Sequence, residues 1–129
     1  MIYVDTSVVL AYVLSESRRP PDDLLLQPLV SSRLLEYESW VRLHAYGLGE
    51  HAGDALRSVL ARLAFVELHP TVLTRVLDPF PTAVRTLDAM HLATAVFVRD
   101  QLRSLSLVSY DHRMRDAAQR LGIEVTTLP

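Results

Sequence analysis

The sequence predicts an α/β fold in which helices cover a central parallel sheet, and three observations support this prediction. Short apolar segments alternate along the chain with segments whose apolar residues recur at helical spacing. The 129 residues, half of them hydrophobic, suffice for one domain over 1–129 with its own core. No internal repeat, low-complexity tract or linker interrupts them. Strands that alternate with helices favour a parallel sheet with right-handed crossovers.

The first strand–helix unit opens the chain. Residues 2–4 are expected to form a short buried strand, and the apolar residues of 8–14 are expected to form a helix. The stretch 15–23, "SESRRPPDD", combines charges with two adjacent prolines, which end helices, so we expect a surface loop there. The apolar residues at 29–30 then lead into the next helix.

The middle of the chain predicts two helices and a strand. One serine of the pair 31–32 is a suitable cap for a long helix that runs until Gly47 or Gly49. The leucines and valine of 51–63 have the spacing of an amphipathic helix. The stretch 64–69, "AFVELH", is expected to be a strand.

The last part of the chain continues the alternation. Pro70 favours the start of a short helix over 70–77, because proline is tolerated in a first turn. A long helix over 82–102 carries one apolar stripe, and 104–111 is rich in β-forming residues. A helix over 112–122 and a closing strand over 123–129 complete the sheet.

Composition excludes several classes of function. Cysteine is absent, so disulfides and thiolate chemistry are excluded, and all 13 basic residues are arginine, which excludes lysine-dependent mechanisms. The net charge of −2 is not that of a generally basic nucleic-acid binder. No apolar run is long enough for a membrane span, and the chain does not open like a secretory signal. We therefore expect a soluble, cytoplasmic protein.

Three aspartates have unusual neighbours. Asp5 follows the strand at 2–4, and Asp111 follows an apolar strand and precedes a helix. Asp5 could be a helix cap, but parallel strands that each end in an aspartate can bring both carboxylates to one edge of the sheet. Asp88 lies near the start of an otherwise apolar helix, where we expect it to be partly desolvated.

A fourth acid comes from the long helix, and two residues compete for this place. Glu36 and Glu38 are about 200° apart on a helix, so both cannot face one cleft. The apolar stripe formed by Tyr37, Trp40 and its helical neighbours Val41, His44 and Ala45 does not settle the choice, because either acid could border it. Periodicity leaves the two open.

Converging carboxylates repel each other unless a cation neutralises them. With oxygen ligands only, the suitable ions are hard, Mg²⁺ or Mn²⁺. Such a site activates water and holds phosphate oxygens, so it supports phosphodiester hydrolysis with one ion or two.

Four segments in this order resemble the PIN domain family, and specifically the VapC-type toxins of bacterial toxin–antitoxin pairs. They are "IYVDTSVVLAYVL", "VSSRLLEYESW", "LDAMHLATAV" and "LVSYDHRMRDAAQRLGIEV". The resemblance implies a three-layer α/β/α fold with a central parallel sheet and an Mg²⁺- or Mn²⁺-dependent endoribonuclease activity on RNA. It also implies a cognate VapB-like antitoxin that inhibits the enzyme, a homodimer and toxin–antitoxin hetero-oligomers.

The acidic quartet of that family maps here to Asp5, Glu36, Asp88 and Asp111, so the resemblance selects Glu36 over Glu38. It implies that Asp5 and Asp88 are the core metal ligands. Asp111 would complete the metal site directly or through water, and Glu36 would position or deprotonate the attacking water.

Other polar residues are expected to support the site or the substrate. Thr6 and Ser109 are expected to orient the carboxylates through hydrogen bonds. Because the chain is acidic overall, RNA contacts must come from local arginines, and the candidates near the acids are Arg85, Arg113 and Arg115.

The remaining acids and histidines are expected to be structural or solvated. His91 shares a helix face with Asp88, but its apolar stripe favours a partly buried structural histidine. Asp116 is expected to lie on the surface, although it could assist the site if its helix starts late. The ordinary surface acids are expected to be Asp22, Asp23, Asp54, Asp78 and Asp100.

Three other classes of function compete with this interpretation. Haloacid-dehalogenase-like phosphatases need a second aspartate two residues after the first, where this chain has Ser7, and they need a lysine. Receiver domains need a lysine too. A catalytically inactive PIN-like binding or scaffold module is the remaining alternative, and the presence of all four acids argues against it.

Overall fold

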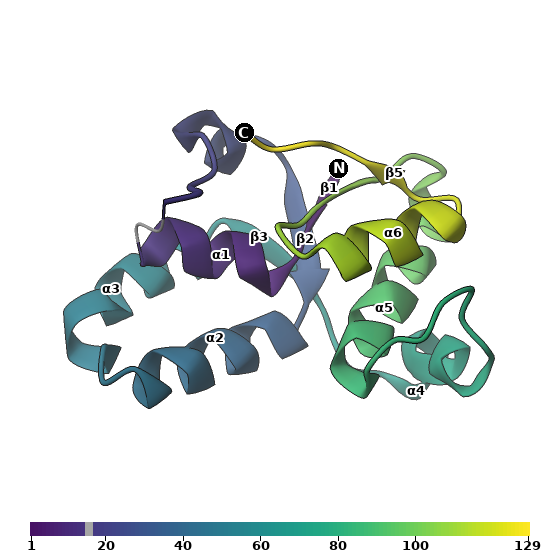
Figure 1. Ribbon diagram of the computed structural model, residues 1–129, viewed down its shortest axis with the longest axis horizontal. Helices are drawn as coiled ribbons and strands as arrows, with labels where there is room; N and C mark the ends of the chain where they lie inside the picture. The colour runs from purple at the N-terminus through teal and green to yellow at the C-terminus, as the bar shows by residue number, and fades with distance from the viewer. Residues whose placement is uncertain (15–16) are drawn as a thin grey trace.

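A five-stranded parallel sheet forms the centre of the molecule (Figure 1). The computed structural model describes residues 1–14 and 17–129, so residues 15–16 of the expected surface loop lie outside the described part. The strands are β1 (Ile2–Val4), β2 (Leu29–Ser32), β3 (Leu63–Val66), β4 (Ser106–Val108) and β5 (Glu124–Val125). They pair in the order β3-β2-β1-β4-β5, and every pairing is parallel, as the sequence predicts.

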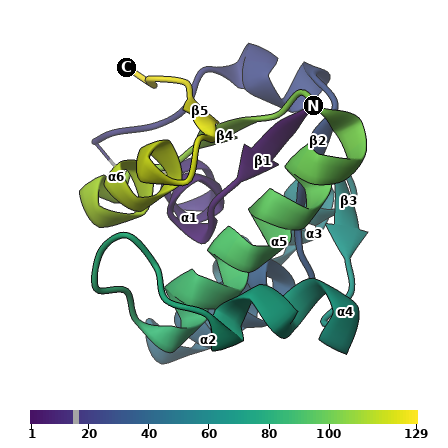
Figure 2. The same ribbon diagram turned by 90° about the vertical axis from the view of Figure 1, so that its right-hand side faces the viewer.

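Helices cover both faces of this sheet (Figures 1 and 2). The helices are α1 (Thr6–Val13), α2 (Leu34–Ala45), α3 (Gly49–Leu60), α4 (Pro70–Leu73), α5 (Thr86–Leu102) and α6 (His112–Arg120), with 3₁₀ turns η1 (Asp22–Leu26) and η2 (Thr74–Leu77). Helices α1, α2 and α3 pack on one face, and α5 and α6 pack on the other. The predicted three-layer α/β/α architecture is confirmed. None of the described helices combines the length and apolar character that a membrane span needs.

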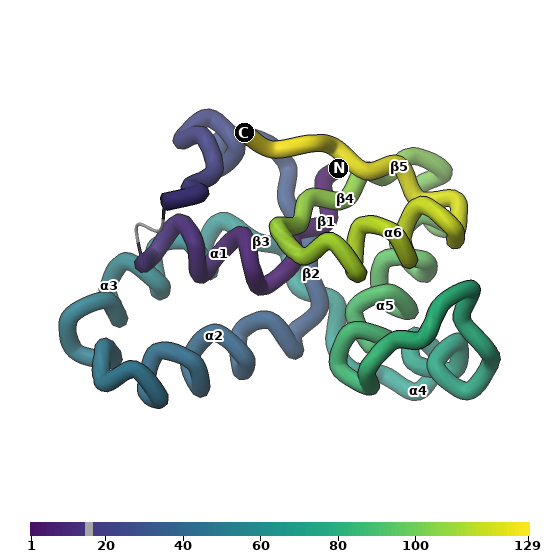
Figure 3. The backbone as a smooth tube through the Cα atoms, in the orientation of Figure 1, coloured from purple at the N-terminus to yellow at the C-terminus, as the bar shows by residue number. Residues whose placement is uncertain are grey.

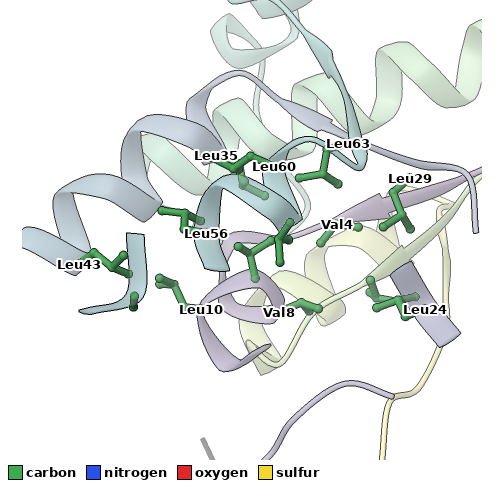
Figure 4. Close-up of a cluster of buried hydrophobic side chains, with 14 residues drawn as sticks. Val4, Val8, Leu10, Leu24, Leu29, Leu35, Leu43, Leu56, Leu60 and Leu63 are labelled. Carbon is green, nitrogen blue, oxygen red and sulfur yellow. The ribbon is translucent and has the colours of Figure 1, made fainter. Parts of the chain in front are cut away.

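The two faces of the sheet bury separate hydrophobic clusters, because successive strand residues point to opposite sides. Val4 packs with Leu35, Leu56 and the other leucines of α2 and α3 in the cluster drawn in Figure 4. Its neighbour Tyr3 packs on the opposite face with Leu92 of α5 and residues of α6. The strand β1 is therefore buried on both sides, which is why "IYV" contains no charged residue.

Several element boundaries differ from the predictions for local reasons. The serine pair 31–32 lies inside β2: Ser32 Oγ accepts the N–H of Leu34 at 3.1 Å, while Ser31 Oγ donates to the Val4 carbonyl at 2.7 Å. Helix α5 begins at Thr86 instead of 82, because Arg85 is in an extended conformation with φ −79° and ψ 161°. The closing strand is limited to the two residues of β5.

The strand order creates a crevice between β1 and β4. From β1 the chain proceeds outward to β2 and β3 on one side, and then returns to β4 and β5 on the other. The helices after β1 and β4, α1 and α6, therefore leave the sheet toward opposite faces, as the backbone path in Figure 3 shows. Open α/β sheets bind their ligands at such a switch point, outside the carboxyl ends of the strands.

Candidate active site

An acidic cleft of about 310 Å³ lies at this switch point. Among the described residues, four carboxylates from separate segments line it: Asp5 after β1, Glu38 on α2, Asp88 on α5 and Asp111 after β4. The other polar or charged residues along its walls are Thr6, Ser7, His91, Arg18, Arg42, Tyr46 and Tyr110. We call this pocket the acidic cleft. Its overall composition is that of a site that holds a cation or a polar ligand, not an apolar molecule.

Asp5 is held rigidly at the end of β1. It precedes α1, yet its side chain makes no capping hydrogen bond to that helix. Instead, Asp5 Oδ2 accepts the hydroxyls of Ser7 at 2.7 Å and Ser109 at 2.8 Å, and the residue is 7% exposed. Within residues 1–14 and 17–129, both side-chain hydrogen bonds of Asp5 end on Oδ2, so Oδ1 is left for a ligand in the cleft. Helix capping therefore does not explain the charge at this position.

Asp111 combines a structural bond with a place in the cleft. It is the N-cap of α6, where its Oδ1 accepts the N–H groups of Arg113 at 2.9 Å and Met114 at 3.5 Å. Ser109 Oγ, which donates to Asp5, also accepts the N–H of Asp111 at 2.9 Å. One serine thus links the two aspartates that end β1 and β4.

The surroundings of Asp88 in the cleft disfavour its charged form. Partial burial raises the pKa of Asp88, and the negative charges of Asp111 and Asp5 raise it further. His91 acts in the opposite direction, while Glu38 adds a smaller increase. The carboxylates are therefore close enough to repel each other, and a cation bound among them would relieve that repulsion.

Glu38 is anchored from two other elements. Its Oε1 accepts the hydroxyl of Thr6 at 2.9 Å and lies 2.6 Å from His91 Nε2. The other ring nitrogen of His91, Nδ1, lies 2.7 Å from Tyr3 Oη, and burial raises the pKa of that phenol so that it stays protonated. His91 is 1% exposed, more deeply buried than the sequence suggested. Thr6 therefore orients Glu38, not one of the aspartates.

Glu36, which the resemblance selects, does not line the acidic cleft. Glu36 lies on another side of α2, where it borders a shallow pocket with Arg33, Trp40 and Phe65. Arg33 Nη1 lies 3.4 Å from Glu36 Oε1, and the same guanidinium bonds to Glu67 at 2.8 Å. Because 200° of helix rotation separates Glu36 from Glu38, only one could reach the cleft.

The predicted RNA-contact arginines have different surroundings. Arg85 and Arg113 are exposed and border, with Asp88, a small pocket of about 200 Å³ next to the cleft. The guanidinium of Arg115 donates to the Ser109 carbonyl at 2.8 Å, so it holds the loop after β4. The cleft itself is lined by Arg18 and Arg42, which were not among the predicted contacts. Arg42 lies one helical turn after Glu38 on α2, and this spacing could have identified it.

Asp116 lies apart from the acids. It pairs with Arg120, one helical turn later, at 3.2 Å. It is not one of the described residues that line the acidic cleft. Its helix begins at His112, too early for Asp116 to turn toward the cleft.

The donor set suits a hard cation, although it is not a ready-made cage. All four carboxylates offer oxygen, which Mg²⁺ and Mn²⁺ prefer. Within residues 1–14 and 17–129, however, no three Asp, Glu or His side chains already stand in a metal-holding arrangement. Asp5 and Asp111 each accept hydrogen bonds from neighbouring hydroxyl or N–H groups on one carboxylate oxygen.

Comparison with known proteins agrees with this geometry. The profile of the PIN domain matches residues 2–120. Ribonuclease VapC46 of Mycobacterium tuberculosis is 38% identical over 130 residues, which cover 96% of this chain and 95% of that protein. Ribonuclease VapC35 of the same species is 33% identical over 131 residues, with 97% and 95% covered. A family profile that spans most of the chain, together with these full-length relatives, shows that the chain belongs to the PIN domain family.

Proposed function

We propose that this protein is the toxin of a VapBC-type toxin–antitoxin pair, an endoribonuclease that hydrolyses RNA phosphodiester bonds with Mg²⁺ or Mn²⁺. The observation that carries this proposal is the convergence of Asp5, Glu38, Asp88 and Asp111 from four segments into one cleft. The similarity to proteins named ribonucleases supports the same substrate class.

We assign two roles to the carboxylates of the cleft: metal binding and proton transfer. Asp5, Asp88 and Asp111 would hold the metal ion, because all three line the acidic cleft and offer it carboxylate oxygens. When bound, a divalent ion supplies a Lewis acid that polarises a phosphate oxygen and lowers the pKa of water.

Glu38 would act as the general base of the reaction. Its Oε1 is occupied by Thr6 and His91, so Oε2 is the atom that would accept a proton from the water that attacks phosphorus. As the new P–O bond forms, the bond to the leaving oxygen breaks, and that oxygen takes up a proton from solvent.

Arginines near the cleft would bind the phosphates of RNA, which the acidic residues would otherwise repel. Arg18 and Arg42 border the cleft, and Arg18 also lies over the Tyr110 ring at 5.1 Å from its centroid. Arg85 and Arg113 flank Asp88 on its other side. We propose that the RNA backbone passes between these two pairs, since guanidinium groups bind phosphate as planar forks.

The metal requirement gives the first test of this proposal. Purified protein should cleave single-stranded or structured RNA when Mg²⁺ or Mn²⁺ is present, and EDTA should stop the cleavage, because the cleft offers carboxylates and no lysine or cysteine. Gel analysis of end-labelled RNA measures the products. Cleavage that continues undiminished in EDTA would refute the metal mechanism, and an inactive protein that still binds RNA would favour the scaffold alternative.

The toxin assignment gives the second test. Expression of this chain alone should arrest bacterial growth, and co-expression of the neighbouring open reading frame should restore it, because an antitoxin that inserts an arginine near the uncompensated carboxylates would block the cleft. The pair should also co-purify, and light scattering on the complex reports whether it contains two copies of this chain. A neighbouring product that neither binds nor relieves the arrest would contradict the toxin–antitoxin pairing.

A further inference from the structure

Tyr3 and His91 form a buried hydrogen-bonded chain that ends on Glu38. Tyr3 Oη lies 2.7 Å from His91 Nδ1, and His91 Nε2 lies 2.6 Å from Glu38 Oε1. Tyr3 is fully buried and His91 nearly so, whereas Glu38 borders the acidic cleft. These hydrogen bonds therefore connect the buried layer between β1 and α5 to Glu38 at the acidic cleft.

The two ends of this chain fix the direction of its hydrogen bonds. An ionised carboxylate can only accept, so His91 Nε2 donates to Glu38. At the other end, Tyr3 Oη accepts the N–H of Ser32 at 3.2 Å, and its own proton is available for His91 Nδ1. Both contacts select the His91 tautomer with the proton on Nε2, because the bond made by one ring nitrogen decides the state of the other.

Two donors meet on the same oxygen of Glu38. Thr6 Oγ1 donates to Oε1 at 2.9 Å, and His91 Nε2 reaches the same atom. Among the described residues, both side-chain hydrogen bonds of Glu38 end on Oε1, so Oε2 is left for the cleft. A glutamate side chain has several flexible torsions. If hydrogen bonds fix the Glu38 side chain before the substrate binds, less conformational entropy is lost on binding.

We infer that Tyr3 and His91 are positioning residues for Glu38, which hold its Oε1 so that Oε2 is presented to the water that attacks RNA. This inference rests on the proposed function. Groups that hold a functional side chain from behind commonly change activity by about 10- to 100-fold when removed. His91 acts in this way through Glu38, since its ring is 1% exposed and its two nitrogens are used by Tyr3 and Glu38.

Three variants test the chain by steady-state cleavage of RNA. His91→Leu removes the donor and should lower kcat by about 10- to 100-fold. KM for RNA should stay unchanged, because the arginines at the cleft are untouched. His91→Gln restores an N–H near the position of Nε2 and should recover part of kcat. Tyr3→Phe removes only Oη and should lower kcat less than His91→Leu does.

A matched control separates positioning from general damage to the core. Thr94→Val removes another buried polar group of α5, whose hydroxyl bonds to the Met90 carbonyl within the same helix at 2.8 Å. It should keep the kcat of the parent protein, and circular dichroism at the assay temperature should show that every compared variant is folded. A parent protein that does not cleave RNA refutes the proposed function instead of this inference.

The inference is overturned by His91→Leu with the kcat of the parent, or by an equal loss in Thr94→Val. A second readout needs neither activity nor a variant: the ¹⁵N spectrum of the His91 ring in the parent protein should show a protonated Nε2 and an unprotonated Nδ1. A protonated Nδ1 would overturn the donor order on which the positioning role depends.

Discussion

Asp5→Asn, Asp88→Asn and Asp111→Asn should each reduce RNA cleavage by about a thousandfold or more. A bound metal contributes several kcal/mol to the stabilisation of charge in the transition state, and each 1.36 kcal/mol is a factor of about ten in rate. Each substitution keeps the size of the side chain but removes one charged ligand from the acidic cleft. Initial rates with Mg²⁺ or Mn²⁺ measure the effect.

The same variants should not be destabilised in metal-free buffer, which separates them from ordinary core damage. Burial and the neighbouring acids raise the pKa of Asp88 in the folded state. Protonated Asp88 therefore favours folding below about pH 4, the ordinary range of an aspartate, and this contribution is lost as the pH rises through the raised pKa. At neutral pH, Asp88→Asn removes the penalty on the charged form, so its free energy of unfolding should equal or exceed that of the parent. This difference in the free energy of unfolding between Asp88→Asn and the parent should vanish below about pH 4, where Asp88 is protonated in both the folded and the unfolded parent.

Metal binding and two surface acids provide the controls. At a hundredfold excess over its dissociation constant, Mn²⁺ should stabilise the parent protein by about 2.7 kcal/mol, and the three cleft variants should gain much less. Among the described residues, Asp54 pairs with the exposed Arg57 and Asp100 pairs with the partly buried Arg99, each on its own helix. Asp54→Asn and Asp100→Asn should change stability by no more than roughly 0.5 kcal/mol and leave cleavage intact. Normal cleavage by Asp88→Asn, or inactive controls, would show that the site is assigned wrongly.

Glu38→Gln should lower kcat by about 10²- to 10⁴-fold, the usual contribution of a general base. The amide fits the same space but cannot accept the proton of water as a carboxylate does. Glu36→Gln is a matched control two residues away, because it changes the same side chain on the same helix outside the cleft. In the described part of the chain, the carboxylate of Glu36 pairs with the partly exposed Arg33, which keeps its shorter bond to Glu67, so this variant should cleave RNA like the parent.

The two variants decide between the resemblance and the geometry. Resemblance in sequence selects Glu36, whereas the contacts with Thr6 and His91 select Glu38. The ratio of the two kcat values measures the outcome directly. If Glu36→Gln is inactive while Glu38→Gln cleaves RNA, the acidic cleft as described is not the catalytic site.

The sequence alone determined the fold and three of the four acids of the cleft. Alternating apolar segments predict a parallel sheet, and the strands of such a sheet present their carboxyl ends at one edge. Asp5 and Asp111 follow two of those strands, so their meeting could be expected before any helix was placed. Asp88 was identified by its apolar neighbours. Each of these conclusions uses only residues adjacent in the chain.

Only the tertiary structure decided between Glu36 and Glu38. Tyr37 and Val41 of the apolar stripe are exposed, while the buried row of α2 is Leu35, Ser39 and Leu43. Periodicity describes the angle between side chains on one helix but contains no information on which neighbour each angle meets. The partners that hold Glu38, Thr6 and His91, lie 32 and 53 residues away, and packing of α2 against the sheet and α5 brings them together.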